Sequence, residues 1–296
     1  MFSADGRILT TLDDKTARLW DGDGKHLVTL AGHTDLIESA VFSADGRRIL
    51  TASSDNTARL WDTDGQFFAT LEGHTAWVNS AVFSVDGQRI LTASWDNTAR
   101  LWDADGQLLA SLEGHTGNVH SAVFSADRRR ILTASWDNTA RLWDGDGKPL
   151  ATLKGHTEWV NGALFSTNGR RILTASSDNT ARLWDTDGKR LATLKGHTGS
   201  VSSAVFSADG RRILTASSDK TARLWDADGK PLATLIGHTD SVQSAVFSAD
   251  GRRILTASDD ETARLWDGDG KPLATLEGHT GGVTSALFSA GGWGAS

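Results

Sequence analysis

The chain has 296 residues, of which 39% are hydrophobic, and its formal net charge is −7 at pH 7. It contains no cysteine, which excludes disulfide bonds and thiolate metal sites, and no apolar run approaches the roughly 20 residues of a membrane-spanning helix. The acidic charge argues against nucleic acid as a partner, because nucleic-acid-binding domains usually carry a basic stripe. The first residues lack the basic and apolar regions of a signal peptide, so we expect a soluble, cytoplasmic protein with no membrane partner.

A unit of 41 residues repeats along almost the whole chain, and each copy contains Gly-His-Thr and, later, Trp-Asp. The Gly-His-Thr histidines are His33, His74, His115, His156, His197, His238 and His279. The Trp-Asp tryptophans, by which we number the copies from one to seven, are Trp20, Trp61, Trp102, Trp143, Trp184, Trp225 and Trp266. Residues shared by every copy are most simply explained by what each copy needs to fold, so we expect function where the copies differ.

Within a copy, four short runs rich in Val, Ile, Leu, Phe and Thr alternate with Asp-Gly or Asp-Asn turns. In copy three these runs are residues 76–84, 88–94, 98–103 and 107–113. The pattern predicts an antiparallel meander of four strands, with no helix of useful length. The first two runs are apolar at nearly successive positions, which predicts that both sheet faces are covered. The three prolines, Pro149, Pro231 and Pro272, each open a fourth run, as is typical of an outer edge strand.

Together, the Gly-His and Trp-Asp repeats resemble the WD-repeat β-propeller family over essentially the full length of the chain. The resemblance implies an all-β fold, in which a seven-bladed propeller with four antiparallel strands per blade forms a single domain over residues 1–296. It also implies that a buried, hydrogen-bonded tetrad of His, Thr, Asp and Trp holds each blade together. Residues of six complete tetrads are His33, Thr51, Asp55, Trp61; His74, Thr92, Asp96, Trp102; His115, Thr133, Asp137, Trp143; His156, Thr174, Asp178, Trp184; His197, Thr215, Asp219, Trp225; and His238, Thr256, Asp260, Trp266.

The seventh set is divided between the two ends of the chain. Thr10, Asp14 and Trp20 have no histidine before them, and His279 has no tryptophan after it. We therefore expect them to share blade one, with residues 6–30 supplying three strands and residues 283–288 the innermost strand, so that the ring closes. The abrupt ends of the chain also suggest a propeller cut from a longer protein, or an engineered propeller with no ligand of its own. We expect a monomer, although near-identical blades make swapped assemblies an alternative.

Two motifs with possible chemistry have simpler structural explanations. Histidine, aspartate and a hydroxyl residue could form a hydrolytic triad, but seven equivalent sets in blade interiors are what satisfying buried polar groups requires. Turns such as residues 21–24, Asp-Gly-Asp-Gly, faintly resemble calcium loops, but they lack the late bidentate glutamate and match ordinary hairpin turns. We therefore predict no catalytic residue, no metal site and no cofactor, and we expect that the protein is not an enzyme.

The informative positions are those that vary at one end of the blades. Four extra tryptophans, Trp77, Trp95, Trp136 and Trp159, occur only in copies three to five, where sister copies carry Ser, Asn, Gly or other smaller residues. Local packing against neighbouring loops is the alternative explanation, but tryptophan is enriched among interface hot spots, so we predict a binding surface. Its flanking polar residues are Asn79, His120 and Asn161.

Copies seven, one and two carry acidic residues at corresponding positions, among them Asp13, Glu38 and Asp259. An aromatic half and an acidic half suit an extended peptide with basic and apolar side chains, whose cations could also lie over indole faces. The leading hypothesis is thus a non-enzymatic scaffold that binds a protein or peptide. A lectin-like, carbohydrate-binding propeller is the alternative, because exposed indoles also stack on sugar rings. Salt separates the two, since only the charge-assisted peptide contact should weaken with ionic strength.

Overall fold

The computed structural model describes residues 1, 3 and 5–288, and all regular secondary structure in these residues is β-strand. The strands form seven consecutive antiparallel sheets, which confirms the predicted all-β fold with one sheet for each copy. The described residues include no helix with the length and apolarity that a membrane crossing needs. The chain forms two compact units, Met1–Asp137 with Arg141–Leu150, and Asn138–Ala140 with Ala151–Ser296. A single domain over residues 1–296 stays a prediction.

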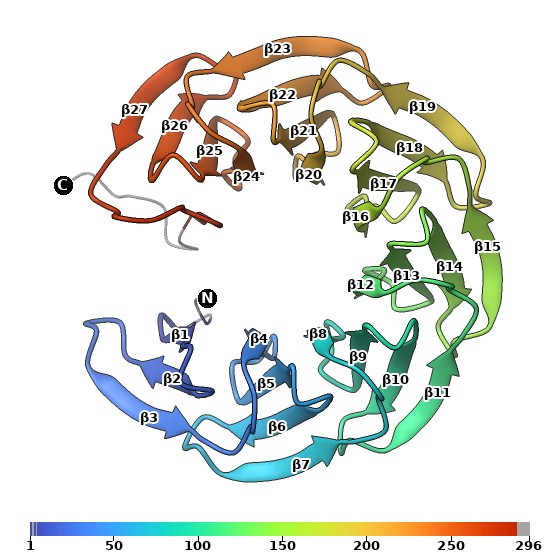
Figure 1. The fold of residues 1–296 in the computed structure, drawn as a ribbon, viewed down its shortest axis with the longest axis vertical. Coiled ribbons are helices and arrows are strands. Elements are labelled where there is room, and N and C mark those ends of the chain that lie inside the picture. The colour runs from blue at the N-terminus through green and yellow to red at the C-terminus, as the bar shows by residue number, and fades with distance from the viewer. Residues whose placement is uncertain (2, 4, 289–296) are drawn as a thin grey trace. The chain divides into compact units, whose positions relative to one another are not determined.

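Each sheet, or blade, contains its strands in chain order, side by side (Figure 1). Blade one consists of β1 (Ile8–Thr11), β2 (Ala17–Trp20) and β3 (His26–Leu30); blade two of β4 (Ile37–Phe42), β5 (Arg48–Ser53), β6 (Ala58–Asp62) and β7 (Phe67–Leu71); blade three of β8 (Val78–Phe83), β9 (Arg89–Ser94), β10 (Ala99–Asp103) and β11 (Leu108–Leu112). Blade four, with residues in both units, consists of β12 (Val119–Phe124), β13 (Arg130–Ser135), β14 (Ala140–Asp144) and β15 (Pro149–Leu153).

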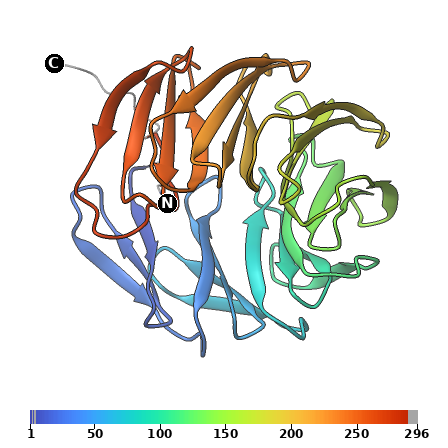
Figure 2. The same cartoon turned by 45° about the horizontal axis from the view of Figure 1, so that its top comes forward.

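The second unit continues the same order. Blade five consists of β16 (Val160–Phe165), β17 (Arg171–Ser176), β18 (Ala181–Asp185) and β19 (Arg190–Leu194); blade six of β20 (Val201–Phe206), β21 (Arg212–Ser217), β22 (Thr221–Asp226) and β23 (Pro231–Ile236); blade seven of β24 (Val242–Phe247), β25 (Arg253–Ser258), β26 (Ala263–Asp267) and β27 (Pro272–Leu276). Figure 2 shows the sheets turned toward the viewer, with the connecting loops emerging at the two ends of the strands.

Turn residues set the length of the strands, as blade three illustrates. Gly87, Asn97 and Gly106 have φ angles of 67°, 69° and 85°, in the left-handed region that glycine and asparagine tolerate best. Each reverses the chain between two strands of five or six residues. The last pairing contains a β-bulge between Leu101 and Trp102, which adds twist beside the outer strand.

The apolar core lies between successive sheets. On β9, Ile90 packs with residues of blade two such as Leu60, whereas its neighbour Leu91 packs with residues of blade four such as Ile131. All four side chains are buried. Adjacent residues of a strand point to opposite faces, so this arrangement confirms the prediction that both faces of the sheet are covered.

Arginines that open the second strand of a blade connect it to the next blade, a feature that the sequence analysis did not predict. The Arg48 guanidinium donates to the carbonyls of Gly87 and of Ala104, the latter at 3.1 Å, and lies 5.4 Å from the Phe83 ring centroid. In the second unit, Arg212 bonds to equivalent carbonyls and lies 5.2 Å from the Phe247 ring. Each bridge thus adds hydrogen bonds and a cation–π contact to the apolar contact between sheets.

Blade one has three strands among the described residues. Residues 283–288, expected to supply its innermost strand, contain no strand. The Val283 amide does donate to the Ser258 carbonyl of blade seven, at 2.9 Å. Closure of the ring by this segment therefore stays a prediction, and residues 291–296, where the repeat decays, lie outside the described residues.

Candidate functional site

The six complete sets of His, Thr, Asp and Trp form the same hydrogen-bonded network in blades two to seven. In blade two, His33 Nδ1 lies 2.8 Å from the Asp55 carboxylate, His33 Nε2 lies 2.8 Å from Thr51 Oγ1, and the Trp61 indole N–H donates to that Oγ1 at 3.0 Å. Corresponding distances in the other five sets are within 0.1 Å of these values.

Burial and hydrogen bonding fix the charges in this network. Burial lowers the pKa of His33, so its imidazole is neutral near pH 7, donates from Nδ1 and accepts at Nε2. Burial alone would raise the pKa of Asp55, but hydrogen bonds from Thr57, the Thr34 amide and His33 together lower it. The network therefore pairs an ionised carboxylate with a neutral imidazole.

The hydroxyl of the network offers no nucleophile to a substrate. Thr51 is completely buried, and its oxygen already accepts the indole N–H of Trp61 while its hydroxyl faces the His33 imidazole. A nucleophile needs an open approach for the reacting carbonyl and a donor site for its oxyanion. Each set therefore works as a structural connection between the loop before the first strand and the third strand of its blade.

The set of blade one is partly formed. The Trp20 indole N–H donates to Thr10 Oγ1 at 2.9 Å, as in the other blades. Asp14 accepts from the Thr16 hydroxyl at 2.5 Å, as Asp55 does from Thr57, but its other side-chain contact is with Arg18, at 2.8 Å. Both Asp14 and His279 are exposed. Completion of this set by His279 stays a prediction.

Three of the four extra tryptophans form one cluster in the first unit. The rings of Trp77 and Trp95 are stacked with centroids 4.4 Å apart, Trp136 lies 5.3 Å from Trp95, and His120 is stacked 6.0 Å from Trp136. Trp77 is 42% exposed, whereas Trp95, Trp136 and His120 are half-buried. We call these four residues together with Asn79 the aromatic site.

Three polar atoms of the aromatic site are buried without a hydrogen-bond partner among the described residues. They are Trp95 Nε1, His120 Nδ1 and Asn79 Oδ1, although Asn79 Nδ2 donates to the His120 carbonyl. Burial also lowers the pKa of His120, so this imidazole is neutral near pH 7. A buried polar atom without a partner costs roughly 1 to 3 kcal/mol, so a bound group that reaches these atoms would recover part of that cost.

The remaining predicted residues lie in several places. Trp159, 48% exposed, and Asn161 belong to the second unit, where Asn161 Nδ2 donates to the Val201 carbonyl at 3.0 Å. Asp259, also in the second unit, accepts from Gln243 at 2.5 Å. In the first unit Asp13 is exposed, and the exposed Glu38 accepts from the Ser54 hydroxyl at 2.6 Å.

Glu38, Asn79 and His120 occupy the same repeat position on β4, β8 and β12, three first strands that lie next to one another. Because β4 contacts β8, Glu38 and Asn79 lie at the same position along two adjacent strands. Acidic and aromatic residues thus adjoin within the first unit.

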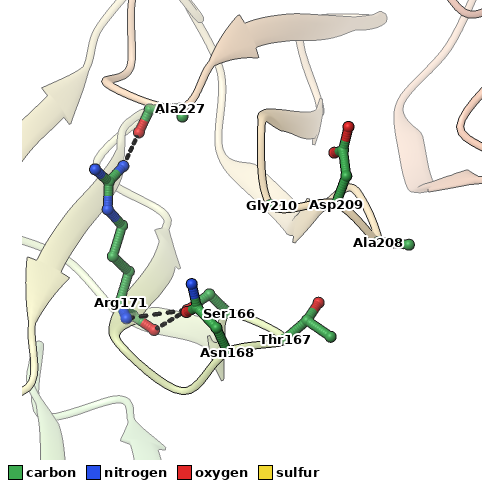
Figure 3. Close-up of a pocket in the computed structure, with 8 residues that line it drawn as sticks. All are labelled: Ser166, Thr167, Asn168, Arg171, Ala208, Asp209, Gly210 and Ala227. Atoms are coloured by element: carbon green, nitrogen blue, oxygen red, sulfur yellow. Dashed lines mark hydrogen bonds between the residues drawn. The ribbon is translucent and has the colours of Figure 1, made fainter.

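Cavities lie at the turns between the first and second strands of the blades, at the other end of the strands from the aromatic site. One, of about 480 Å³, is lined by Ser166, Arg171 and Asp209 among others, and Arg171 crosses it to the Ala227 carbonyl (Figure 3). A second, of about 590 Å³, has Arg89 and Asp127 in the equivalent repeat positions. Because the same hollow recurs beneath the arginine bridges, it is a feature of the repeat. The described residues contain no group of three or more His, Cys, Asp or Glu side chains that could hold a metal ion.

Comparison with known proteins identifies the repeat. The family model described as WD domain, G-beta repeat matches residues 24–62, 65–103, 106–144, 147–185, 188–226, 229–267 and 270–293. No curated protein matches the sequence. Among solved structures, the computationally designed Ika8 protein is similar with a TM-score of 0.87 and 26% identity, over 98% of this chain and 89% of that chain. Because 1820 chains of solved structures match, the fold alone does not select a ligand.

Proposed function

The chain belongs to the WD40 repeat family, and from this membership we propose that it binds a protein or peptide at the aromatic site and its acidic neighbours. WD repeats on a β-propeller-like fold indicate a non-enzymatic scaffold, and WD40 domains generally mediate protein interactions. A cytoplasmic location belongs to the same proposal, since a chain without cysteine gains no disulfide from an oxidising compartment.

The stacked tryptophans are the observation that carries this proposal. Trp77 presents a large, rigid surface, and its stacking on Trp95 means that little side-chain entropy remains to be lost on binding. Sister blades fill the position of Trp95 with Ser54 or Ser177, so the repeat does not need an indole there. Tryptophan is enriched among the hot spots at the centre of interfaces.

Acidic residues beside the cluster indicate the chemistry of the partner. Glu38 adjoins Asn79 through neighbouring strands, and Asp13 is a further exposed carboxylate of the same unit. Asp259, Trp159 and Asn161, in the second unit, stay predicted binding residues. A peptide with one apolar side chain over Trp77 and a lysine or arginine toward Glu38 fits these residues, and its cation could also lie against an indole face.

The test compares the wild-type protein with the variant Trp77→Ser/Trp95→Ser/Trp136→Ser. Both are used to select peptides from a random display library, and the selected peptides are measured by calorimetry. We expect peptides rich in basic and apolar residues that bind the wild type and lose about 2 kcal/mol or more of binding free energy with the variant. The matched control is Phe68→Ser, which removes an exposed aromatic side chain from the outer strand β7 and should leave peptide binding unchanged. Peptides that bind both proteins equally would contradict the proposal.

A lectin-like function is the second candidate, because Trp77 is exposed and Asn79 Oδ1 has no partner among the described residues. A glycan array probed with the same two proteins separates the candidates. Sugar binding that survives about 1 M salt would favour the lectin, since uncharged stacking is barely screened. If neither peptides nor glycans bind, the remaining explanation is a propeller without a ligand of its own.

A further inference from the structure

The outer edges of blades two and three differ from those of every other blade. In the other five, the turn before the last strand ends in Lys, and the next residue is His, Pro or Arg. Here the corresponding residues are Gln66-Phe67-Phe68 before and within β7, and Gln107-Leu108-Leu109 before and within β11. Lysine and proline on an edge strand prevent association with other chains. The two neighbouring blades therefore carry neither lysine nor proline here, and each has one more large apolar side chain, Phe67 or Leu108, beside the apolar residue that every blade has at the next position.

These apolar residues are exposed on two outer strands that meet at one turn. Phe67, Phe68, Leu108 and Leu109 are between 48% and 58% exposed. The turn that leads into β11 touches β7, because a Cβ atom on Gly106 would lie 3.1 Å from the Cβ of Ala69. Phe67 is held by the Trp61 ring at 5.6 Å and by the Arg59 guanidinium at 5.8 Å. We call this surface, β7 and β11 with the residues that flank them, the β7/β11 edge.

The strands of the β7/β11 edge and the turns that lead into them carry charge of one sign. Residues 62–72 contain three carboxylates and no cation, and so do residues 103–113. The carboxylates that flank the strands, Glu72 and Glu113, are exposed. In the other five blades at least one lysine lies in the equivalent segment. Two β7/β11 edges would therefore repel each other, whereas a basic strand edge would be attracted.

Only one outer edge of this chain has more cations than carboxylates. It is β19 in blade five, where residues 185–195 carry Lys189, Arg190 and Lys195 against two aspartates. All three cations are exposed, and Leu191 between them is 47% exposed. The β19 edge thus has an apolar residue framed by positive charges, which complements the β7/β11 edge.

We propose that the β7/β11 edge binds the β19 edge of a second copy of this chain. The contact joins two different surfaces, so it leaves one free edge of each kind on the pair and allows further copies to add. The exposed apolar surface of the β7/β11 edge is on the order of 400 Å², about half of the roughly 800 Å² that each partner of a standard interface buries. The association is therefore weak, reversible and sensitive to salt. The monomer expected from the sequence is the opposing outcome of the test.

The test is sedimentation velocity of the full chain over a range of concentrations in about 10 mM and about 1 M salt. We expect concentration-dependent association at low salt that decreases at high salt. Asp64→Lys/Glu72→Lys/Asp105→Lys/Glu113→Lys leaves four lysines against two aspartates on the β7/β11 edge and should weaken association at least tenfold. Lys189→Glu/Lys195→Glu leaves one arginine against four carboxylates on the β19 edge and should weaken it equally. Lys230→Glu/Lys271→Glu makes the same charge change on the outer edges of blades six and seven, and should leave association unchanged.

Mixing the two weakened variants gives the decisive result. The reversed β7/β11 edge of the first matches the reversed β19 edge of the second, so the mixture should associate although neither variant does alone. A protein that sediments as a monomer at every concentration in low salt would overturn the proposal. So would association that both charge-reversed variants retain, or a mixture that fails to associate.

Discussion

Replacing Asp96 with alanine is expected to lower the free energy of unfolding by roughly 3 to 5 kcal/mol. The carboxylate accepts hydrogen bonds from His74 Nδ1 at 2.7 Å, from the Thr98 hydroxyl at 2.6 Å and from the Thr98 amide at 2.9 Å. Without it, the buried His74 N–H loses its acceptor, which costs about 1 to 3 kcal/mol. The two lost bonds of the turn add about 1 kcal/mol each.

Urea denaturation followed by tryptophan fluorescence measures this loss, and Asp14→Ala is the matched control. Asp14 occupies the same repeat position in blade one, but its carboxylate is exposed and bonds to Thr16 and Arg18. Asp14→Ala also removes two turn bonds, but it leaves no buried histidine without its acceptor, so the control should cost clearly less than Asp96→Ala, at most about 2 kcal/mol. Equal effects of the two substitutions, or an Asp96→Ala protein as stable as the wild type, would refute the structural role assigned to the networks.

Four further predictions concern stability. Trp95→Ser, which copies the serine of sister blades, should change the free energy of unfolding by less than about 1 kcal/mol, and a loss above about 2 kcal/mol in urea would make the indole a core residue. Arg128 has a φ of 61° at a turn position where all six sister copies have glycine, so Arg128→Gly should stabilise the protein by about 0.5 to 1 kcal/mol; a lower urea midpoint would contradict this. Ending the chain after Glu277 should lower Tm by more than about 5 °C if residues 283–288 close the ring, and an unchanged Tm would count against closure. Because burial lowers the pKa of His33 in the folded protein, the unfolded chain binds a proton at higher pH, so stability should fall as pH drops through about 6.5. Burial alone would raise the pKa of Asp96, but hydrogen bonds from His74 and Thr98 lower it, so stability should fall further below about pH 4. Urea midpoints that stay constant from about pH 7 to 3 would contradict both expectations.

The strands were predictable because turn residues mark their ends. In blade three, the expected runs 76–84 and 98–103 contain β8 and β10, since Asp-Gly and Asp-Asn allow few conformations other than a reversal. The apolar run through Ile90 and Leu91 also identified a strand covered on both faces. Periodicity gave the positions of the tetrad residues for the same reason: each copy has the same local constraints.

The side-chain geometry of the aromatic site was not predictable. The sequence placed Trp77 and Trp95 near each other, but whether such indoles stack or spread apart depends on backbone positions in separate loops. Trp77 is exposed, as a binding surface requires, whereas Trp95 is half-buried, as the alternative of local packing requires, so each explanation describes part of the cluster. The Trp95 Nε1 atom is buried and has no hydrogen-bond partner among the described residues. The sequence could not predict this either, because the burial of an atom depends on neighbours that are far apart in the sequence.

The arginine bridges were not predicted, although the sequence contains a sign of them. Arginine opens the second strand of copies two to seven without exception, yet the contacts of Arg48 with Gly87 and Ala104 were missed. Arg48 lies 39 positions before Gly87 and 56 before Ala104, so both of its partners belong to the next copy. A search for residues needed within one copy cannot detect a contact between copies.

The arginine bridges also bear on how such a chain can change its length. An internal copy carries both halves of the joint: an arginine directed to the copy that follows, and turn carbonyls that receive the arginine of the copy before, as the bridges of Arg48 and Arg212 illustrate. The joint consists largely of main-chain carbonyls, which any sequence supplies. A copy inserted or removed by unequal recombination therefore restores the connection on both sides without a compensating mutation, and near-identical copies make such recombination frequent. The number of blades is then limited by how the two ends meet, and each internal copy is interchangeable with its neighbours except for the residues it displays in its loops.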